Sequence, residues 1–561
     1  MAFKAQEQRI GELLGRRVYS IPRNQRRYVW TDDNWNELIA DIQFSIKSNK
    51  PHFLGSIVLK IDDDKGDISA FTVIDGQQRT ITILLFLTAI MQVFKDRADQ
   101  QRFEGQKSYL LTTDLSNSSR CKVLSDEYVK FAEIIEEVCK WESSYDSIDL
   151  LLGSDSSESS IEIKRCISFF YNKCLELGLQ ESLLIRDALL GAKYVEIIAT
   201  TEEDSYTVFE ILNARGQPLE NHELLKNFIM RYTLPVRNVD RVKIQWDSEL
   251  AKGLGKYLGQ FIKHYVVHKY KKDGKRTDYE IIKHNTPTAY VDQLFKDLLC
   301  KASYYRKIVM LDNKSAYSDV EYYVFKYLFS KKGILFRPLL MSLMHQKDLK
   351  QISIKQYEAM LYFILHFFVC YNLLGKETSN KISDLVQNFS YKIEMSFGYD
   401  VVKDLLADLI EKLPNRGDFI NNFVLIGWSH SYDFYKDSSN KRRVKVALET
   451  IERIKTGKAI EDDFTIEHIL PDAQEQSNAR IGNLIPLEAN LNANCKDKDF
   501  RNKLQYYKKS SYLTARNISE RFSDSTVQFK PEERGKIMAG EVYDAIDEMK
   551  KMCLALFQNV V

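Results

Sequence analysis

A histidine near the carboxyl-terminal end of the sequence lies among side chains that suit phosphodiester hydrolysis. His468 follows Glu467 in an apolar run that ends at Pro471, and it is the only histidine after His430. A neutral imidazole accepts a proton from an attacking water near neutral pH. A hard divalent ion beside a phosphate binds oxygen ligands, and a polar amide fixes the geometry of such a site. The carboxylate and amide side chains near His468 are therefore candidates for the same chemistry.

The elements that must position these side chains are expected in the order strand, loop, strand, helix. An apolar run, a polar stretch, a second apolar run and a helical pattern follow one another at residues 464–471, 472–480, 481–487 and 488–503. This order is the outline of a ββα-metal nuclease finger. We expect Asn492, on the helix, to face His468 and to supply oxygen to a metal. In a regular strand the side chain of Glu467 points to the opposite face and reaches the metal only if the strand ends at His468.

The same segment resembles a known family. The matching residues are Ile466–Pro471 (IEHILP), Gly482–Leu487 (GNLIPL), Asn492 and Phe500–Lys503 (FRNK). They resemble the nuclease domain of GmrSD-type restriction endonucleases, which belong to the His-Me finger (HNH) superfamily. The resemblance implies that His468 is the general base, Asn492 a Mg²⁺ ligand, Asn483 an amide that orients the site, and Glu467 a second metal ligand.

One position departs from the pattern of many HNH enzymes. They carry a second histidine on the helix, where this sequence has Asn492. Amide and carboxylate oxygens suit hard ions, so this departure favours Mg²⁺ or Mn²⁺ over Zn²⁺. The plainer alternative is that His468, lying before a turn, is a hydrogen-bonded structural residue.

A second group of candidate residues lies near the amino-terminal end. Asp75, Gly76, Gln77, Gln78 and Arg79 separate an apolar strand pattern from an apolar helical pattern. At such a junction free backbone N–H groups and the helix dipole favour an anion. The glycine allows close backbone approach, the arginine offers a planar fork for phosphate oxygens, and the aspartate can hold a metal or polarise water.

Further arginines and a structural alternative accompany this junction. Arg23, Arg26 and Arg27 are candidates for additional phosphate contacts from a neighbouring loop. In the alternative, Asp75 caps the helix that follows and Arg79 pairs with a surface carboxylate. The sequence contains no G-x-x-x-x-G-K-[ST] segment, which excludes a P-loop ATPase.

The amino-terminal half also resembles a known domain. The matching blocks are Ile21–Trp30, Phe53–Val58, Val73–Thr80, Phe209–Leu219 and Leu224–Lys226, with Asn24 as a departure from an often aromatic position. In this order they resemble the ParB/sulfiredoxin-like partner domain of the same restriction enzymes. The resemblance implies nucleoside triphosphate (NTP) binding or hydrolysis at the junction that contains Asp75 and Arg79.

Composition bounds the fold class. The chain has 561 residues, with 23 Gly and 10 Pro, and this scarcity favours helices over short strands and turns. We expect a helix-rich α+β multidomain protein. Its parts would be a ParB/sulfiredoxin-like α/β domain at 1–235, a helical linker domain at 236–415 and the HNH nuclease domain at 416–561.

Composition also bears on the compartment and the partners. The net charge of +2 neither supports nor excludes DNA binding, and eight cysteines without a C-x-x-C pair fit reduced thiols in a cytoplasm. The most apolar stretch, residues 359–374, is shorter than the roughly 20 residues of a membrane span, so we expect a buried helix and no membrane association. His264 and His268 have the spacing to share a metal, but we expect a plain helix surface.

Together these features predict an NTP-regulated, divalent-metal-dependent DNA endonuclease with NTPase activity. The resemblance implies phage defence through restriction of modified double-stranded DNA, and we include a homodimer among the expected states. One alternative is a nucleotide-gated DNA-binding protein with an inactive finger. The other is a nuclease that senses a phosphorothioate backbone or acts on RNA.

Overall fold

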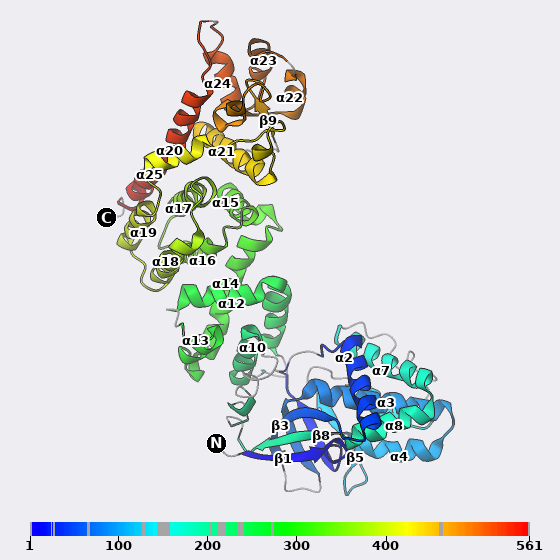
Figure 1. Ribbon diagram of the computed structural model, residues 1–561. Helices are drawn as coiled ribbons and strands as arrows, with labels where there is room; N and C mark the ends of the chain where they lie inside the picture. Colours follow the sequence, from blue (N-terminus) through cyan, green and yellow to red (C-terminus); the bar gives the residue numbers. More distant parts are fainter. Residues whose placement is uncertain are drawn as a thin grey trace. The chain divides into compact units, whose positions relative to one another are not determined.

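The computed structural model describes most of the chain. The described residues are 3–23, 25, 28–63, 68–125, 131–142, 158–201, 204–205, 207–209, 220–233, 235, 240–270, 274–458, 464–496, 498–524 and 526–558. They divide into two compact units, Met1–Lys243 and Ile244–Val561 (Figure 1). Arg26, Arg27 and residues 210–219 lie outside the described residues.

The first unit contains a six-stranded mixed sheet. In spatial order its strands are β1 (Phe3–Arg9), β8 (Lys193–Ala199), β3 (Phe53–Asp63), β4 (Ser69–Asp75), β2 (Arg17–Ile21) and β7 (Val123–Ser125). Strands β3 and β4 pair antiparallel, with Val58 opposite Asp75. The sheet therefore holds the Asp75 junction at the end of its β4 strand.

Helix α3 (Gln77–Asp96) is the central helix of this unit. It is buried around its whole circumference from Thr80 to Phe94, with mostly apolar side chains, as a helix in the centre of a core is. Helices α7 (Glu158–Leu177) and α4 (Gln100–Leu110) pack against it. Its threonines satisfy their buried hydroxyls locally, as when Thr82 Oγ1 donates to the Gln78 carbonyl at 2.7 Å. The core thus fixes the helix that begins directly after the Asp75–Gly76 junction.

The second unit begins as a helical bundle. Its main helices are α12 (Leu258–Lys269), α14 (Val291–Met310), α15 (Asp319–Ser330), α16 (Arg337–Asp348), α17 (Ile354–Phe368) and α18 (Ser383–Met395). Ser318 and Ser353 start α15 and α17 by accepting hydrogen bonds from the backbone N–H groups of Glu321 and Gln356. The helix-rich α+β architecture predicted from the sequence is confirmed.

The last helix joins the bundle to the segment that carries His468. Helix α25 (Pro531–Gln558) packs against α17 of the bundle and also against α20 (Arg416–Val424) and α21 (Ser438–Thr456) (Figure 1). Residues 244–561 accordingly form one compact unit. The division at residues 415 and 416 stays a prediction.

The apolar stretch lies inside the bundle. Ile354–Leu374 is the one helical segment of the described residues that is long and apolar enough to cross a membrane, and 72% of its most apolar window is buried in protein. This burial is consistent with a soluble protein, and it accounts for the hydrophobicity of the stretch without a bilayer.

The expected surface position of His264 and His268 is wrong. Their exposed fractions are 9% and 0%, so both rings lie within the bundle. His264 Nδ1 pairs with the Tyr305 hydroxyl and His268 Nδ1 with the Ser342 hydroxyl, each at 3.0 Å. Because each ring has its own hydroxyl partner, the pair serves packing rather than a shared metal.

Candidate functional site

The strand, loop, strand and helix expected around His468 are present. Strand β9 (Thr465–His468) pairs antiparallel with β10 (Leu484–Leu487), and His468 lies opposite Leu484. Helix α22 (Ala489–Cys495) follows directly. His468 is the last residue of its strand, and at a strand end the chain is free to turn away.

Asn483 holds the loop that follows His468. Its side chain is fully buried. Oδ1 accepts a hydrogen bond from the backbone N–H of Leu470 at 2.9 Å, and Nδ2 donates to the carbonyls of Leu470 and Asn478 at 2.8 Å each. One amide thus closes the loop between the two strands, and its role in orienting the site stays a prediction.

The imidazole of His468 is fixed by a backbone carbonyl. Its Nε2 lies 2.9 Å from the Trp428 carbonyl oxygen, and its ring stacks on the Trp428 indole with centroids 5.9 Å apart. A carbonyl only accepts hydrogen bonds, so Nε2 carries the proton and Nδ1 of the neutral ring carries the lone pair. Burial lowers the pKa of His468, while the Trp428 carbonyl and Asp472 act in the opposite direction. The ring is held in its neutral, proton-accepting form.

The segment that provides this carbonyl was missed by the sequence analysis. Trp428 N donates to the Ala479 carbonyl at 2.9 Å, and Ile481 N donates to the Ile426 carbonyl at 2.7 Å. Between them Gly427 runs so close that an added Cβ would lie 2.4 Å from the Ala479 oxygen. The available sequence signal was the run Gly427–His430 (GWSH), which concentrates rare residue types.

The carboxylate of Asp472 interacts electrostatically with the imidazole of His468. Its carboxylate accepts a hydrogen bond from the Ser429 hydroxyl at 2.5 Å. Burial acts to raise the pKa of Asp472, but the Ser429 hydroxyl and His468 hold it below its usual value. An ionised carboxylate near the ring stabilises the imidazolium that forms when His468 accepts a proton.

Glu467 faces away from His468, as strand alternation predicts. Its buried Oε1 accepts a hydrogen bond from the Tyr507 hydroxyl at 2.9 Å and pairs with Lys503 Nζ at 2.8 Å. Both partners lie on α23 (Phe500–Tyr507). Lys503 Nζ also donates to the His468 carbonyl at 2.7 Å, so one ammonium group binds two consecutive residues of β9.

Asn492 does not face His468 across the strand, and the expectation is corrected here. Its Nδ2 donates to the Thr465 hydroxyl at 2.8 Å and to the Ile466 carbonyl at 3.3 Å, near the start of β9. Thr465 and Glu467 alternate to the same face of the strand, so the Asn492 amide lies on the Glu467 face. Helix α22 is short and contacts β9, and these two hydrogen bonds hold its Asn492 beside the start of the strand.

The donor chemistry on this face fits a hard divalent ion. A carboxylate and an amide oxygen are ligands that Mg²⁺ and Mn²⁺ accept. The described residues contain no group of three or more His, Cys, Asp or Glu side chains that could hold a metal. An ion held by Glu467 and Asn492 would complete its shell with phosphate or water oxygens, and Lys503 would have to release the carboxylate.

In the first unit the structure brings three predicted residues together. Asp75 ends β4, and Gly76 precedes α3 with a φ of 94°. A Cβ on Gly76 would lie 2.9 Å from the Ile57 side chain, so a larger residue meets both strain and a clash. Arg79 Nη2 lies 3.6 Å from the Asp75 carboxylate, and Nη1 donates to the Leu54 carbonyl at 2.6 Å. Burial lowers the pKa of Arg79 and Asp75 raises it.

The remaining predicted residues of this junction have other positions. Gln77 and Gln78 are buried, and Gln78 Oε1 accepts a hydrogen bond from Val29 N at 2.9 Å. Arg23 donates to the Met230 carbonyl at 2.9 Å, so the phosphate contact predicted for it is replaced by an anchor at the end of α10 (Asn221–Tyr232). Asp75 does not cap α3, because the residue at that position is Gly76.

The close contact of Gly427 with the Ala479 carbonyl leads to a prediction about stability. Gly427→Ala places a methyl group against the Ala479 carbonyl and the Tyr435 ring, so segment 426–431 must move away from the loop after β9. We expect a loss of about 1–3 kcal/mol in unfolding free energy, measured by urea denaturation. Gly417→Ala, in the first turn of α20, is the matched control, since the atom nearest to its added Cβ is Asn415 Oδ1 at 3.5 Å. An unchanged stability in Gly427→Ala would contradict the close packing.

The comparisons with known proteins agree with both regions of resemblance. A family model described as the GmrSD restriction endonuclease N-terminal domain matches residues 7–230, and one described as the GmrSD restriction endonucleases C-terminal domain matches residues 429–534. The first match contains Asp75–Arg79 and the second contains His468, Asn483 and Asn492. No curated protein matches the chain.

Proposed function

We infer the function from one premise: the chain belongs to the GmrSD restriction endonuclease family, so it is a restriction endonuclease and its substrate is DNA. The observation that carries the finer proposal is the fixed tautomer of His468, with Nε2 on the Trp428 carbonyl at 2.9 Å. In our proposal the second unit hydrolyses DNA phosphodiesters at this residue.

The proposed reaction starts with a proton transfer to His468. Nδ1 accepts a proton from the attacking water, whose oxygen forms a bond to phosphorus while the bond to the leaving sugar oxygen breaks. The leaving oxygen takes a proton from solvent. The imidazolium that results is stabilised by the nearby Asp472 carboxylate. Asn483 keeps the loop after His468 in place throughout.

A divalent ion is part of the proposal. Glu467 and Asn492 would hold Mg²⁺ or Mn²⁺ on one face of β9. The ion would supply stabilisation of the negative charge on phosphate oxygens, and it would serve the phosphate at His468 only if these two side chains left their present partners on the opposite face of β9. The donor types support this assignment, and the contact between Lys503 and Glu467 is the feature that such binding must displace.

Nucleotide control is proposed for the first unit. Asp75 and Arg79 lie together at the strand-to-helix junction, and Arg79 presents a partly buried guanidinium there. A guanidinium beside the start of a helix is suited to phosphate oxygens, which supports NTP binding and hydrolysis at this place. Restriction of modified double-stranded DNA in phage defence, a cytoplasmic location and a homodimer belong to the same proposal, on the strength of the family resemblance.

The central prediction concerns His468. Replacing it by alanine removes the proton acceptor and should lower DNA cleavage by about 10²–10⁴-fold. Cleavage of unmodified and modified duplex DNA with Mg²⁺ provides the measurement. His284→Ala, at an exposed histidine of the bundle, is the control and should cleave normally. Full cleavage by His468→Ala would contradict the proposed general base. Binding of DNA without any cleavage by the wild type would support a DNA-binding protein with an inactive finger, and cleavage confined to phosphorothioate DNA or RNA would support the other alternative.

A second prediction tests the metal assignment without an activity readout. Lys503→Met removes the ammonium group that neutralises buried Glu467, so the apoprotein should lose roughly 3–5 kcal/mol of stability. Mn²⁺ should then raise its thermal midpoint more than that of the wild type, because the carboxylate is free to bind the ion. Lys508→Met, at an exposed lysine one residue beyond α23, is the control. Equal Mn²⁺ responses in Lys503→Met and Lys503→Met/Glu467→Gln would refute Glu467 as a ligand.

The nucleotide junction gives a third prediction. Arg79→Ala should weaken NTP binding at least tenfold and remove the effect of NTP on cleavage, since a charge-assisted phosphate contact is lost. Titration calorimetry and cleavage assays with each NTP measure the two effects. Arg97→Ala, an exposed arginine at the other end of α3, should behave as wild type. An unaltered NTP response in Arg79→Ala would rule out the junction as the nucleotide site.

A further inference from the structure

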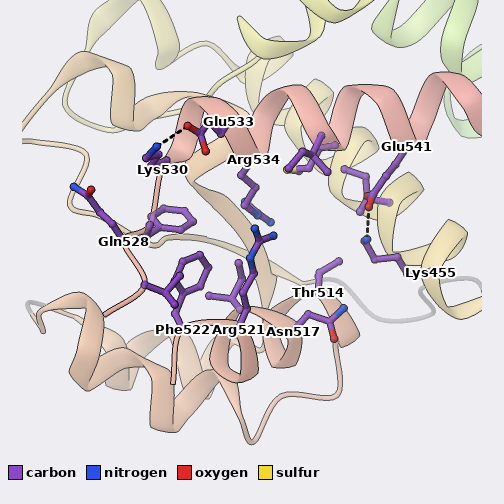
Figure 2. A pocket seen from close by; sticks show the side chains of 16 residues that line it. Lys455, Thr514, Asn517, Arg521, Phe522, Gln528, Lys530, Glu533, Arg534 and Glu541 are labelled. Carbon is purple, nitrogen blue, oxygen red and sulfur yellow. Dashed lines mark hydrogen bonds and ion pairs between the residues drawn. The ribbon is translucent and has the colours of Figure 1, made fainter. Parts of the chain in front are cut away.

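A pocket of about 220 Å³ lies outside the His468 site, between α21, α24 (Leu513–Arg521) and α25 (Figure 2). Its walls combine charged, amide and aromatic side chains from these helices and from residues 522–530. Pockets for drug-sized ligands are typically ~300–1,000 Å³. The volume therefore suits a smaller group, such as a phosphate with one attached sugar or base.

The charges that line this pocket do not balance. Its side chains include four cations and two carboxylates: Lys455, Arg521, Lys530, Arg534, Glu533 and Glu541. Lys455 pairs with Glu541 at 2.7 Å, and Lys530 pairs with Glu533 at 2.7 Å. Among the described residues no ion pair remains for the two arginines. The pocket accordingly has an excess of positive charge carried by Arg521 and Arg534.

These two guanidinium groups converge. Figure 2 shows Arg521 reaching up from α24 and Arg534 reaching down from α25, so that their side chains point toward each other in the pocket. Like charges in a partly buried space repel one another, and an anion between them removes that cost. Arg521 rests against the Phe522 ring at 5.8 Å and is otherwise exposed.

Arg534 connects the pocket to the strand beside His468. Its Nη1 donates to the Gly482 carbonyl at 2.8 Å and to the Leu484 carbonyl at 2.9 Å, and Leu484 is the residue paired with His468. Both acceptors are neutral, so they orient the guanidinium without cancelling its charge. Burial lowers the pKa of Arg534 to about 10, and the Glu541 carboxylate acts in the opposite direction. The pairing of β9 with β10 thus connects Arg534, in the pocket, to the position of His468.

The remaining walls suit a nucleic acid component. Phe522 and Phe529 are buried, with ring centroids 5.3 Å apart, and form an apolar floor beside the arginines. Asn517 and Gln528 add neutral amides at the same pocket. In protein–DNA complexes, arginine, amide and backbone N–H groups make many of the contacts to phosphate and sugar oxygens. A purely apolar or a purely acidic pocket would offer no such donors.

We propose that the pocket between α21, α24 and α25 is a phosphate-binding subsite for the polynucleotide, in which Arg521 and Arg534 hold one phosphate group outside the His468 site. The proposal rests on the proposed function, because DNA is the substrate of that site. Arg521 supplies affinity from the rim. Arg534 places the bound phosphate in register with β10, so that binding here positions the duplex relative to His468.

The experiment measures binding in the absence of cleavage. The full chain is titrated into a short fluorescent duplex in EDTA, at several salt concentrations, and anisotropy is recorded. Arg521→Gln should weaken binding about tenfold at low salt and reduce the slope of log affinity against log salt by about 1, as the loss of one phosphate contact predicts. Asn517→Asp places a carboxylate in the pocket and should weaken binding at least as much.

Lys536→Gln is the matched control, because it removes one positive charge from an exposed position of α25 that does not line the pocket. Circular dichroism confirms that each variant is folded. The proposal is overturned if Arg521→Gln and Lys536→Gln bind the duplex equally. It is also overturned if Arg521→Gln binds the duplex as the wild type does and loses only the rise in thermal midpoint that inorganic phosphate or AMP causes. Failure here is separable from failure of the nuclease assignment, since His468→Ala should bind the duplex normally and lose only cleavage.

Discussion

The hydrogen bond between His468 Nε2 and the Trp428 carbonyl is the interaction on which the account of this site depends. It selects the tautomer and leaves Nδ1 as the only basic atom of the ring. A backbone acceptor serves this purpose well, because it cannot exchange roles with its donor as a hydroxyl can. Its position is set in turn by the hydrogen bonds of Trp428 and Ile481, which tie segment 426–431 to the loop after β9.

A few polar side chains from the surrounding structure hold the backbone around this hydrogen bond in place. Asn483 closes the loop from within, Lys503 binds the end of β9 from α23, and Arg534 binds β10 from α25. Each anchor donates to backbone carbonyls, so the finger is held by its main chain rather than by its small core. Because α25 also packs on α17, the same helix that orients β10 belongs to the bundle.

Local patterns in the sequence predicted the elements and the general placement of the site. The runs around His468 and residues 481–487 gave the paired strands, alternation gave the opposite orientation of Glu467, and Gly76 marked the junction before α3. The missed features involve contacts between distant residues. Trp428 contributes a carbonyl, a group that every residue has, and no spacing rule indicates which one is used. Arg23 and Asn492 were assigned from side-chain chemistry and position along the chain, but the guanidinium of Arg23 and the amide of Asn492 have nearer partners in the packed chain.

The most direct test of the central claim is the tautomer of His468, measured by long-range ¹⁵N–¹H correlation spectroscopy on the full chain labelled at histidine nitrogen, with His468→Gln identifying the signal. The account predicts a neutral ring at pH 7 with the proton on Nε2 and a pyridine-like Nδ1. A neutral ring with the proton on Nδ1 would contradict it, because that form cannot donate to the Trp428 carbonyl and has no lone pair on the proposed basic atom.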